Sequence, residues 1–160
     1  YQPDLPEPDN PDFAVIDLCK TPVKIVANEY HPLAKKKGIC QQDLESFPAL
    51  ALPKGWFPRT EEKLRSHGLW STEARMKRYK RELWEGKTED QTTLSYATCL
   101  GLEVMENLSV LDYDLDLTSG ESLIVKRSLM DNEKVHSLLS CLKERILKKA
   151  KIHNELTPCF

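Results

Sequence analysis

The sequence predicts an α+β fold, in which a small antiparallel β-hairpin or sheet packs with three or four helices and is preceded by a proline-rich extended arm. Two observations carry this prediction. Nine of the ten prolines lie within the first 58 residues, and the residues after them follow helical and strand-like apolar patterns. Proline fixes φ and lacks an N–H donor, so long regular elements are not expected where it recurs. We therefore expect a largely irregular arm over residues 1–58 and a compact α+β body over residues 59–157.

The arm nevertheless carries large apolar side chains, which solvated linkers generally lack. Extended segments with regularly placed hydrophobic groups are one way in which a protein binds along a neighbour. Aromatic side chains concentrate the binding free energy of such contacts. The predicted partner-binding residues are Phe13, Ile16, Phe47, Leu50, Leu52, Trp56 and Phe57. The alternative is that the arm packs back on its own body as irregular structure.

Helices are predicted after residue 58 by their capping residues. Thr60 can cap a short helix through His67, closed by Gly68, and a second helix is expected over residues 72–85. The run that begins at Thr88 has the form of a capping box for a third helix. Residues 92–106 also suit a strand, because apolar residues recur there at every second position. The capping box favours the helix.

A strand is predicted at residues 111–117, where apolar side chains alternate with three aspartates. Turn residues follow, and the apolar run at residues 123–125 completes a hairpin. A long amphipathic helix then begins at Asp131. Its apolar stripe has helical spacing and comprises Val135, Leu138, Leu139, Leu142, Ile146 and Ala150.

The net charge of −2 hides an uneven distribution of charged side chains along the sequence. Residues 54–87 carry ten basic and five acidic side chains, and this segment contains the expected helix 72–85. A basic helix face can contact the phosphates of nucleic acid. The residues predicted for this alternative are Arg75, Lys77, Arg78, Lys80 and Arg81. The same face would equally suit a solvated surface or an acidic protein partner.

Asp112, Asp114 and Asp116 would project from one face of the expected strand, about 6–7 Å apart. Carboxylates spaced in this way can share a divalent cation, as in metal-dependent phosphoryl transfer. No glycine-rich phosphate loop accompanies them in the sequence. Three like charges also keep the open face of a strand soluble. We therefore assign no metal site and no catalytic residue.

The five cysteines are an odd number, and none of them has CxxC spacing. Neither a zinc site nor a redox motif is indicated, and the set fits a reducing compartment: the cytoplasm, the nucleus or the mitochondrial matrix. No apolar run reaches the roughly 20 residues of a membrane-spanning helix, and no secretory signal opens the sequence. We expect neither a cofactor nor a membrane partner.

Together these features predict a non-catalytic protein-interaction or assembly subunit of a larger intracellular complex. It would bind other protein subunits through the arm and an exposed face of the body. The first alternative is an RNA- or DNA-contacting component, such as part of a ribonucleoprotein, acting through the basic helix 72–85. The second is a metal-dependent phosphoryl-transfer enzyme that uses Asp112, Asp114 and Asp116. The oligomeric state is left open.

Overall fold

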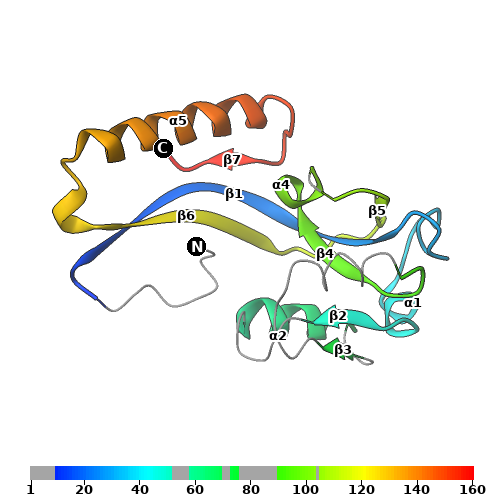
Figure 1. Cartoon of the computed structure of the whole chain (residues 1–160). Helices are drawn as coiled ribbons and strands as arrows, with labels where there is room; N and C mark the ends of the chain where they lie inside the picture. The colour runs from blue at the N-terminus through cyan, green and yellow to red at the C-terminus, as the bar shows by residue number, and fades with distance from the viewer. Residues whose placement is uncertain (1–9, 52–57, 70–72, 76–89, 104) are drawn as a thin grey trace. The chain divides into compact units, whose positions relative to one another are not determined.

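The computed structural model describes residues 10–51, 58–69, 73–75, 90–103 and 105–160 (Figure 1). The chain divides into two compact units. Unit 1 comprises residues 1–22 and 118–160, and unit 2 comprises residues 23–117. The predicted boundary at residue 58 therefore falls inside unit 2.

The longest strand is β1 (Phe13–Asn28), which spans 16 residues and contributes to both units. In unit 1 it pairs antiparallel with β6 (Thr118–Lys126), and in unit 2 it pairs antiparallel with β4 (Ser95–Thr98). The prediction of a fold built on a small hairpin with an extended proline arm is therefore wrong. The apolar, β-branched runs at residues 13–16 and 23–26 favour a strand, and they outweigh the nearby prolines.

Pro22 is tolerated in β1 because it lies where the strand changes its partner. Its own partner is Thr118, the first residue of β6. The next residue, Val23, donates its backbone N–H to the carbonyl of Leu117 at 2.8 Å and then pairs with β4. A proline at such a change costs few ladder hydrogen bonds.

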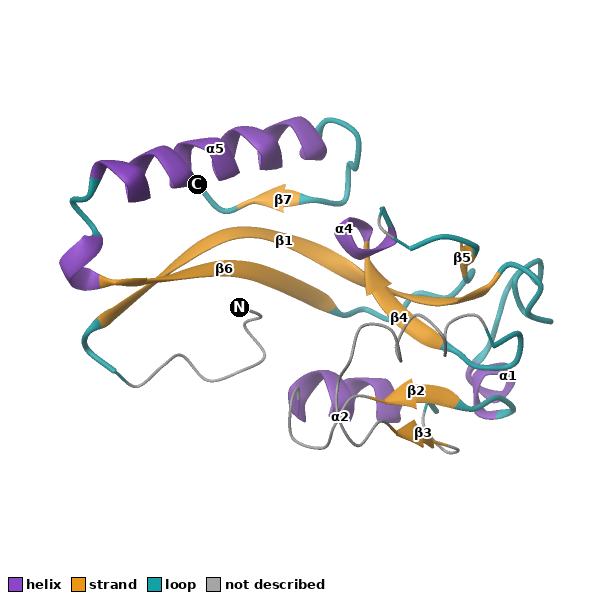
Figure 2. Cartoon of the chain, viewed as in Figure 1, coloured by secondary structure: helices purple, strands orange, loops and turns teal. Residues whose placement is uncertain are grey.

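Unit 1 contains the β1–β6 pair, the short helix η1 (Arg127–Leu129), the long helix α5 (Glu133–Ala150) and the strand β7 (Thr157–Pro158) (Figure 2). β7 pairs with β1 at Cys19 and Lys20. Among the described residues of this unit, the buried apolar side chains are Leu18, Cys19, Val125 and Leu156.

In unit 2, β1 lies between β4 and β5 (Leu108–Val110). A second, parallel pair joins β2 (Ala49–Ala51) to β3 (Glu73–Arg75). Cross-strand partners share one face of a sheet, so Ile25 and Tyr96 lie together on the face that meets the core. The buried cluster consists of Val23, Ile25, Ala27, Leu33, Ile39, Leu44, Ala49, Leu64, Leu69, Leu94, Leu111 and Leu115.

Two short helices flank this core. Helix α1 spans Gln41–Glu45, and helix α2 spans Pro58–Ser66. The predicted helix over residues 60–67 is confirmed as α2, although it begins two residues earlier, with proline at its first position. Gly68 has φ +79° just past its end, as expected for a glycine that terminates a helix.

The preference for a helix over residues 92–106 is wrong for most of that segment. Residues 95–98 form β4, and only a single helical turn follows, α4 (Cys99–Leu102). The period-two apolar pattern identified the strand, because Leu94 and Tyr96 are the residues directed to the core. Thr98, within the segment, caps the short turn by accepting a hydrogen bond from Gly101 N–H at 3.3 Å.

The predicted strand at residues 111–117 is also wrong, because this segment has no regular secondary structure. Leu111 and Leu115 are both buried, but the backbone here makes local hydrogen bonds in place of a strand ladder, as when Tyr113 N–H donates to the carbonyl of Leu111 at 2.9 Å. The backbone N–H of Asp116 donates to the carboxylate of Asp114 at 3.0 Å, and Asp116 has φ +46°. Aspartate readily forms such local turns and tolerates the left-handed conformation. The predicted hairpin partner, residues 123–125, does lie in a strand, but β6 pairs with β1 instead.

The predicted C-terminal helix is confirmed as α5. Asn132 caps it by accepting a hydrogen bond from the backbone N–H of Lys134 at 2.9 Å. Along the predicted stripe Leu138 is 48% exposed, and no α5 residue is fully buried. Across the parts of the chain that the structure describes, no helix is both long and apolar enough to span a bilayer.

Candidate functional site

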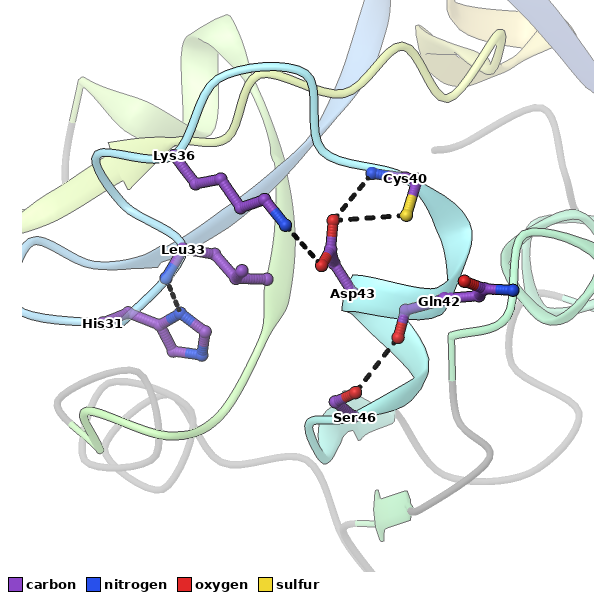
Figure 3. A network of polar contacts seen from close by, with 7 residues as sticks. All are labelled: His31, Leu33, Lys36, Cys40, Gln42, Asp43 and Ser46. Atoms are coloured by element: carbon purple, nitrogen blue, oxygen red, sulfur yellow. Dashed lines mark hydrogen bonds and ion pairs between the residues drawn. The ribbon is translucent and has the colours of Figure 1, made fainter.

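A network of polar contacts in unit 2 runs from the end of β1 to α1 (Figure 3). It contains three local groups: His31 with Leu33, Asp43 with Lys36 and Cys40, and Ser46 with Gln42. Each bond joins a side chain to a neighbour within seven residues. The network therefore shapes the loop between β1 and α1.

His31 is the buried titratable group of this loop, with 3% of its surface exposed. Its Nδ1 accepts a hydrogen bond from the backbone N–H of Leu33 at 3.0 Å, so the neutral ring carries its proton on Nε2. The ring packs at 4.5 Å, centroid to centroid, against Phe47. Burial lowers the pKa of His31, and the Thr92 backbone and the charge of Asp90 partly oppose this. Burial thus favours the neutral imidazole, which packs here as a structural group.

Asp43 closes the N-terminus of α1. Its carboxylate accepts hydrogen bonds from the backbone N–H and the thiol of Cys40, at 3.0 Å and 3.3 Å. The ammonium of Lys36 lies 2.5 Å from the other carboxylate oxygen. The Lys36 bond, followed by the Cys40 bonds, lowers the pKa of Asp43 to about 2. The Cys40 thiol therefore acts here as a hydrogen-bond donor to a carboxylate.

The three aspartates of residues 112–116 have three separate roles. Asp112 accepts a hydrogen bond from the backbone N–H of Gly38 at 3.1 Å, and Asp114 accepts one from Asp116. Asp116 lies 3.6 Å from the ammonium of Lys63. Within the described residues no group of three metal-ligating side chains converges. The phosphoryl-transfer alternative depended on a shared strand face, and that face does not exist.

Tyr113 and His67 form a polar pair across unit 2. The Tyr113 hydroxyl and His67 Nδ1 are 2.7 Å apart, and the two rings meet edge to face. Burial is the main cause that raises the pKa of Tyr113, with smaller contributions from Cys40 and Asp114. This contact anchors the 111–117 segment against the turn after α2.

Unit 2 contains a cavity of about 340 Å³ beside this segment. Its lining residues are Lys24, Val110, Leu111, Asp112, Tyr113 and Asp114. One ammonium and two carboxylates give it a mixed polar character, which suits a molecule with both donor and acceptor groups better than a simple anion.

Unit 1 contains a second cavity, of about 500 Å³, at the open end of the β1–β6 pair. Its lining residues are Pro11, Asp12, Phe13, Lys126, Arg127 and Ser128. Two cations, one carboxylate and one aromatic ring meet there, so the charge balance is opposite to that of the cavity in unit 2.

The predicted partner-binding residues do not form one surface of an arm. Phe13 and Ile16 are half-buried in β1, and the half-buried Phe47 packs on the core of unit 2. Leu50 is fully buried in β2. The remaining three, Leu52, Trp56 and Phe57, lie outside the described residues.

The predicted nucleic-acid residues belong to a segment of which only a short part is described. Arg75 is the last residue of β3, so a helix does not run unbroken over residues 72–85. The other four, Lys77, Arg78, Lys80 and Arg81, lie outside the described residues.

Several functional groups of this region were missed from the sequence. The spacing of Cys40 and Asp43 is that of a capping box with a thiol in place of a hydroxyl, and it could have predicted α1. The hydrogen bond between His67 and Tyr113 joins residues 46 positions apart, so no local sequence pattern could have predicted it.

The comparisons with known proteins give a fold but no family. No protein-family model matches the chain, and no curated protein matches it. Among solved structures, a full-length BenM mutant has a TM-score of 0.66 at 19% identity, covering 91% of this chain and 50% of that one. The effector-binding domain of a BenM variant also has a TM-score of 0.66, at 17% identity, over 91% of this chain and 70% of that one. The regulatory domain of MetR, a LysR family regulator from N. meningitidis, has a TM-score of 0.63 at 10% identity, over 97% and 73% of the two chains.

These similarities correct the predicted fold class. The chain has the α/β fold, divided into two units, that is found in regulatory domains of LysR-type proteins. It spans half the length of full-length BenM. The predicted small hairpin sheet behind an arm does not describe this fold.

The same similarities correct the predicted function. The prediction of an assembly or adaptor subunit is wrong, since the structures with this fold are described as effector-binding and regulatory domains. The phosphoryl-transfer alternative and the ribonucleoprotein alternative through helix 72–85 fall with it. The expectation that the chain is not an enzyme agrees with these neighbours, which are regulatory domains.

Proposed function

We propose that this chain is the effector-binding part of a LysR-type transcriptional regulator, which changes its conformation when a small molecule binds. The observation that carries the proposal is the similarity to an effector-binding domain over 91% of the chain at a TM-score of 0.66. Fold alone does not determine function, so the proposal also needs support from the architecture of this chain.

The architecture supports it through the two connections between the units. β1 continues from unit 1 into unit 2, and the chain returns at residues 117–118 into β6. A difference in ligand affinity between two arrangements of the units would shift their populations. β1, which continues from one unit to the other, and the return connection at residues 117–118 are suitable elements to transmit such a shift.

The ligand class follows from the neighbours. One solved structure is the BenM effector-binding domain with its effector benzoate, with a TM-score of 0.65 at 18% identity. Another is the CcmR regulatory domain of Synechocystis in complex with 2-PG, with a TM-score of 0.65 at 16% identity. We therefore expect a small-molecule effector for this chain, and we assign it no catalytic step and no cofactor.

A transcriptional regulator also needs contact with DNA. The chain spans 50% of full-length BenM, and we assign the DNA contact to the part of such a regulator that lies outside this span. The nucleic-acid partner that the sequence left as an alternative is thereby kept, but the contact is not assigned to residues 72–85. The neighbours with named sources are bacterial, so we propose a bacterial cytoplasm and not a nucleus or a mitochondrial matrix.

The proposal is tested with the full-length regulator in a transcription reporter, screened against a library of small organic metabolites. We expect at least one compound to change transcription several-fold. A destabilised variant, Leu50→Ala, should weaken the fold of unit 2 and reduce the transcriptional response without altering any DNA-contacting segment. If no compound changes transcription, or if the response is unchanged in a regulator that lacks residues 1–160, the proposal is wrong.

A further inference from the structure

Arg127 is held in a fixed orientation at the end of β6 by two hydrogen bonds to the segment before β1. Its backbone N–H donates to the carbonyl of Asp12 at 2.7 Å, and its Nε donates to the carbonyl of Pro11 at 2.8 Å. Its two terminal nitrogens have no hydrogen-bond or ion-pair partner among the described residues. A guanidinium fixed through Nε can offer its remaining donors to a carboxylate with little further loss of conformational entropy.

The neighbours of Arg127 add a second cation and a hydroxyl group. Lys126 and Ser128 both line the same cavity of about 500 Å³, and both are exposed. Lys126 is the last residue of β6, and Ser128 lies in η1, which Figure 2 shows directly after that strand. Three consecutive side chains thus provide hydrogen-bond donors around one space.

An apolar surface continues from these donors along the same face of the strand pair. Phe13 lines the cavity and is the cross-strand partner of Lys126. Two residues further along, Val15 is paired with Ile124, and these residues share the face of Phe13 and Lys126. Ile124 is 38% exposed, so this surface is open to a ligand.

Among the described residues that line the cavity, Asp12 is the one acidic side chain. Its backbone N–H donates to the side chain of Asn10 at 2.9 Å, and its carboxylate is exposed. It reduces the attraction of the cavity for an anion but does not reverse it, because Lys126 and Arg127 leave a net charge of +1 among the described lining residues. Its effect on affinity can therefore be measured by removing the charge.

We propose that this cavity of unit 1 is a binding site for a small organic carboxylate with an apolar body. The carboxylate accepts hydrogen bonds from Arg127, Lys126 and Ser128, and the apolar body lies on Phe13 and toward Val15 and Ile124. The site is built within unit 1 alone. It goes beyond the proposed function, because it does not require the chain to belong to a transcriptional regulator.

Phenylacetate and its neutral amide, phenylacetamide, test the site on the intact 160-residue chain. Binding is followed by isothermal calorimetry and by the amide NMR shifts of Phe13, Lys126, Arg127 and Ser128. We expect saturable shifts at these amides with phenylacetate and about tenfold weaker binding of phenylacetamide, since a charge-assisted hydrogen bond is lost. Inorganic phosphate, which lacks an apolar body, should bind more weakly than phenylacetate.

Variants separate the site from general charge attraction. Arg127→Gln should weaken phenylacetate binding about tenfold, whereas Asp12→Asn should strengthen it about threefold. The matched control is Arg145→Gln on α5, an exposed arginine outside the cavity, and it should leave the affinity unchanged. If Arg127→Gln disturbs the fold at the end of the strand pair, Asp12→Asn still tests the site, because it should increase the affinity.

The site does not exist if none of the four amides shifts saturably with phenylacetate. It is also contradicted if phenylacetamide binds as tightly, if phosphate binds more tightly, or if Arg145→Gln weakens binding as much as Arg127→Gln. These outcomes leave the transcription reporter of the proposed function unaffected, so the two proposals fail separately.

Discussion

The carboxylate of Asp112 accepts a hydrogen bond from the backbone N–H of Gly38, 74 residues away in the sequence, at 3.1 Å. This bond joins the loop before α1 to the irregular segment at residues 111–117. Replacing Asp112 with Ala should lower the free energy of unfolding by about 0.5–1.5 kcal/mol, the usual contribution of one such bond. The measurement is urea denaturation. Glu29→Ala, which also removes an exposed acidic side chain of unit 2, is the control and should change little. An equal effect of both variants would mean that the bond is not formed.

His31 should make the stability of unit 2 depend on pH. Its pKa is lowered in the folded chain, so below pH 6.5 the unfolded chain binds a proton that the folded chain does not. The free energy of unfolding should therefore be at its full value above pH 6.5 and fall as the pH drops below it. Urea denaturation at pH 7.5 and pH 5.5, about one unit on either side of the usual pKa of histidine, measures this.

Two variants assign that dependence to His31. His31→Asn keeps an acceptor for the backbone N–H of Leu33 but does not titrate, so it should lose much of the decline between the two pH values. His136→Gln removes an exposed histidine of α5 and should keep the decline. The assignment to His31 fails if the Asn variant declines as steeply as the unmodified chain.

Leu50 should behave as a core residue and not as a partner contact. It is fully buried in β2, so Leu50→Ala should lower the free energy of unfolding by about 2–5 kcal/mol. Leu138→Ala on α5, where the side chain is 48% exposed, should cost well under half as much. Comparable values from thermal or urea denaturation would contradict the placement of β2 in the core.

Gly68 should resist substitution for both conformational and steric reasons. Its φ is +79°, and a Cβ there would lie 2.6 Å from Cγ of Glu45 and 2.8 Å from Cγ of Gln41. Gly68→Ala should destabilise the chain by about 1–2 kcal/mol, because the left-handed conformation disfavours any side chain. Gly101→Ala is the matched control, since its Cβ would meet atoms only at 3.7 Å. If Gly101→Ala is the more harmful change, the turn after α2 is not as described.

Local patterns predicted the helices α2 and α5, but they missed α1 and favoured a helix where β4 lies, and they predicted the strands poorly. The cap and stripe of α5 involve neighbouring residues only, and so does the glycine that ends α2. β1 depends on its pairing with β4 and β6, which lie about 70 to 110 residues later in the chain. A local pattern in one sequence does not identify such distant partners. The prolines were given too much weight, because Pro22 lies where β1 passes from its pairing with β6 to its pairing with β4.

The segment at residues 111–117 shows that one sequence pattern can occur both in a strand and in an irregular segment. Alternation of leucine and aspartate predicts a strand, but here Leu111 and Leu115 are buried in an irregular segment, and Asp114 accepts a local hydrogen bond from the backbone N–H of Asp116. The cavity of unit 1 could not be predicted at all. Arg127 and Pro11 are 116 residues apart, and only the pairing of β1 with β6 brings them together.

Hydrogen exchange on the proposed full-length regulator, with and without a compound found to change transcription, is the most direct test of the proposal that this chain senses an effector. The account predicts that bound compound slows amide exchange within residues 1–160, including β1 and β6, the strands at the connections between the two units. Exchange that changes only outside residues 1–160 would contradict it.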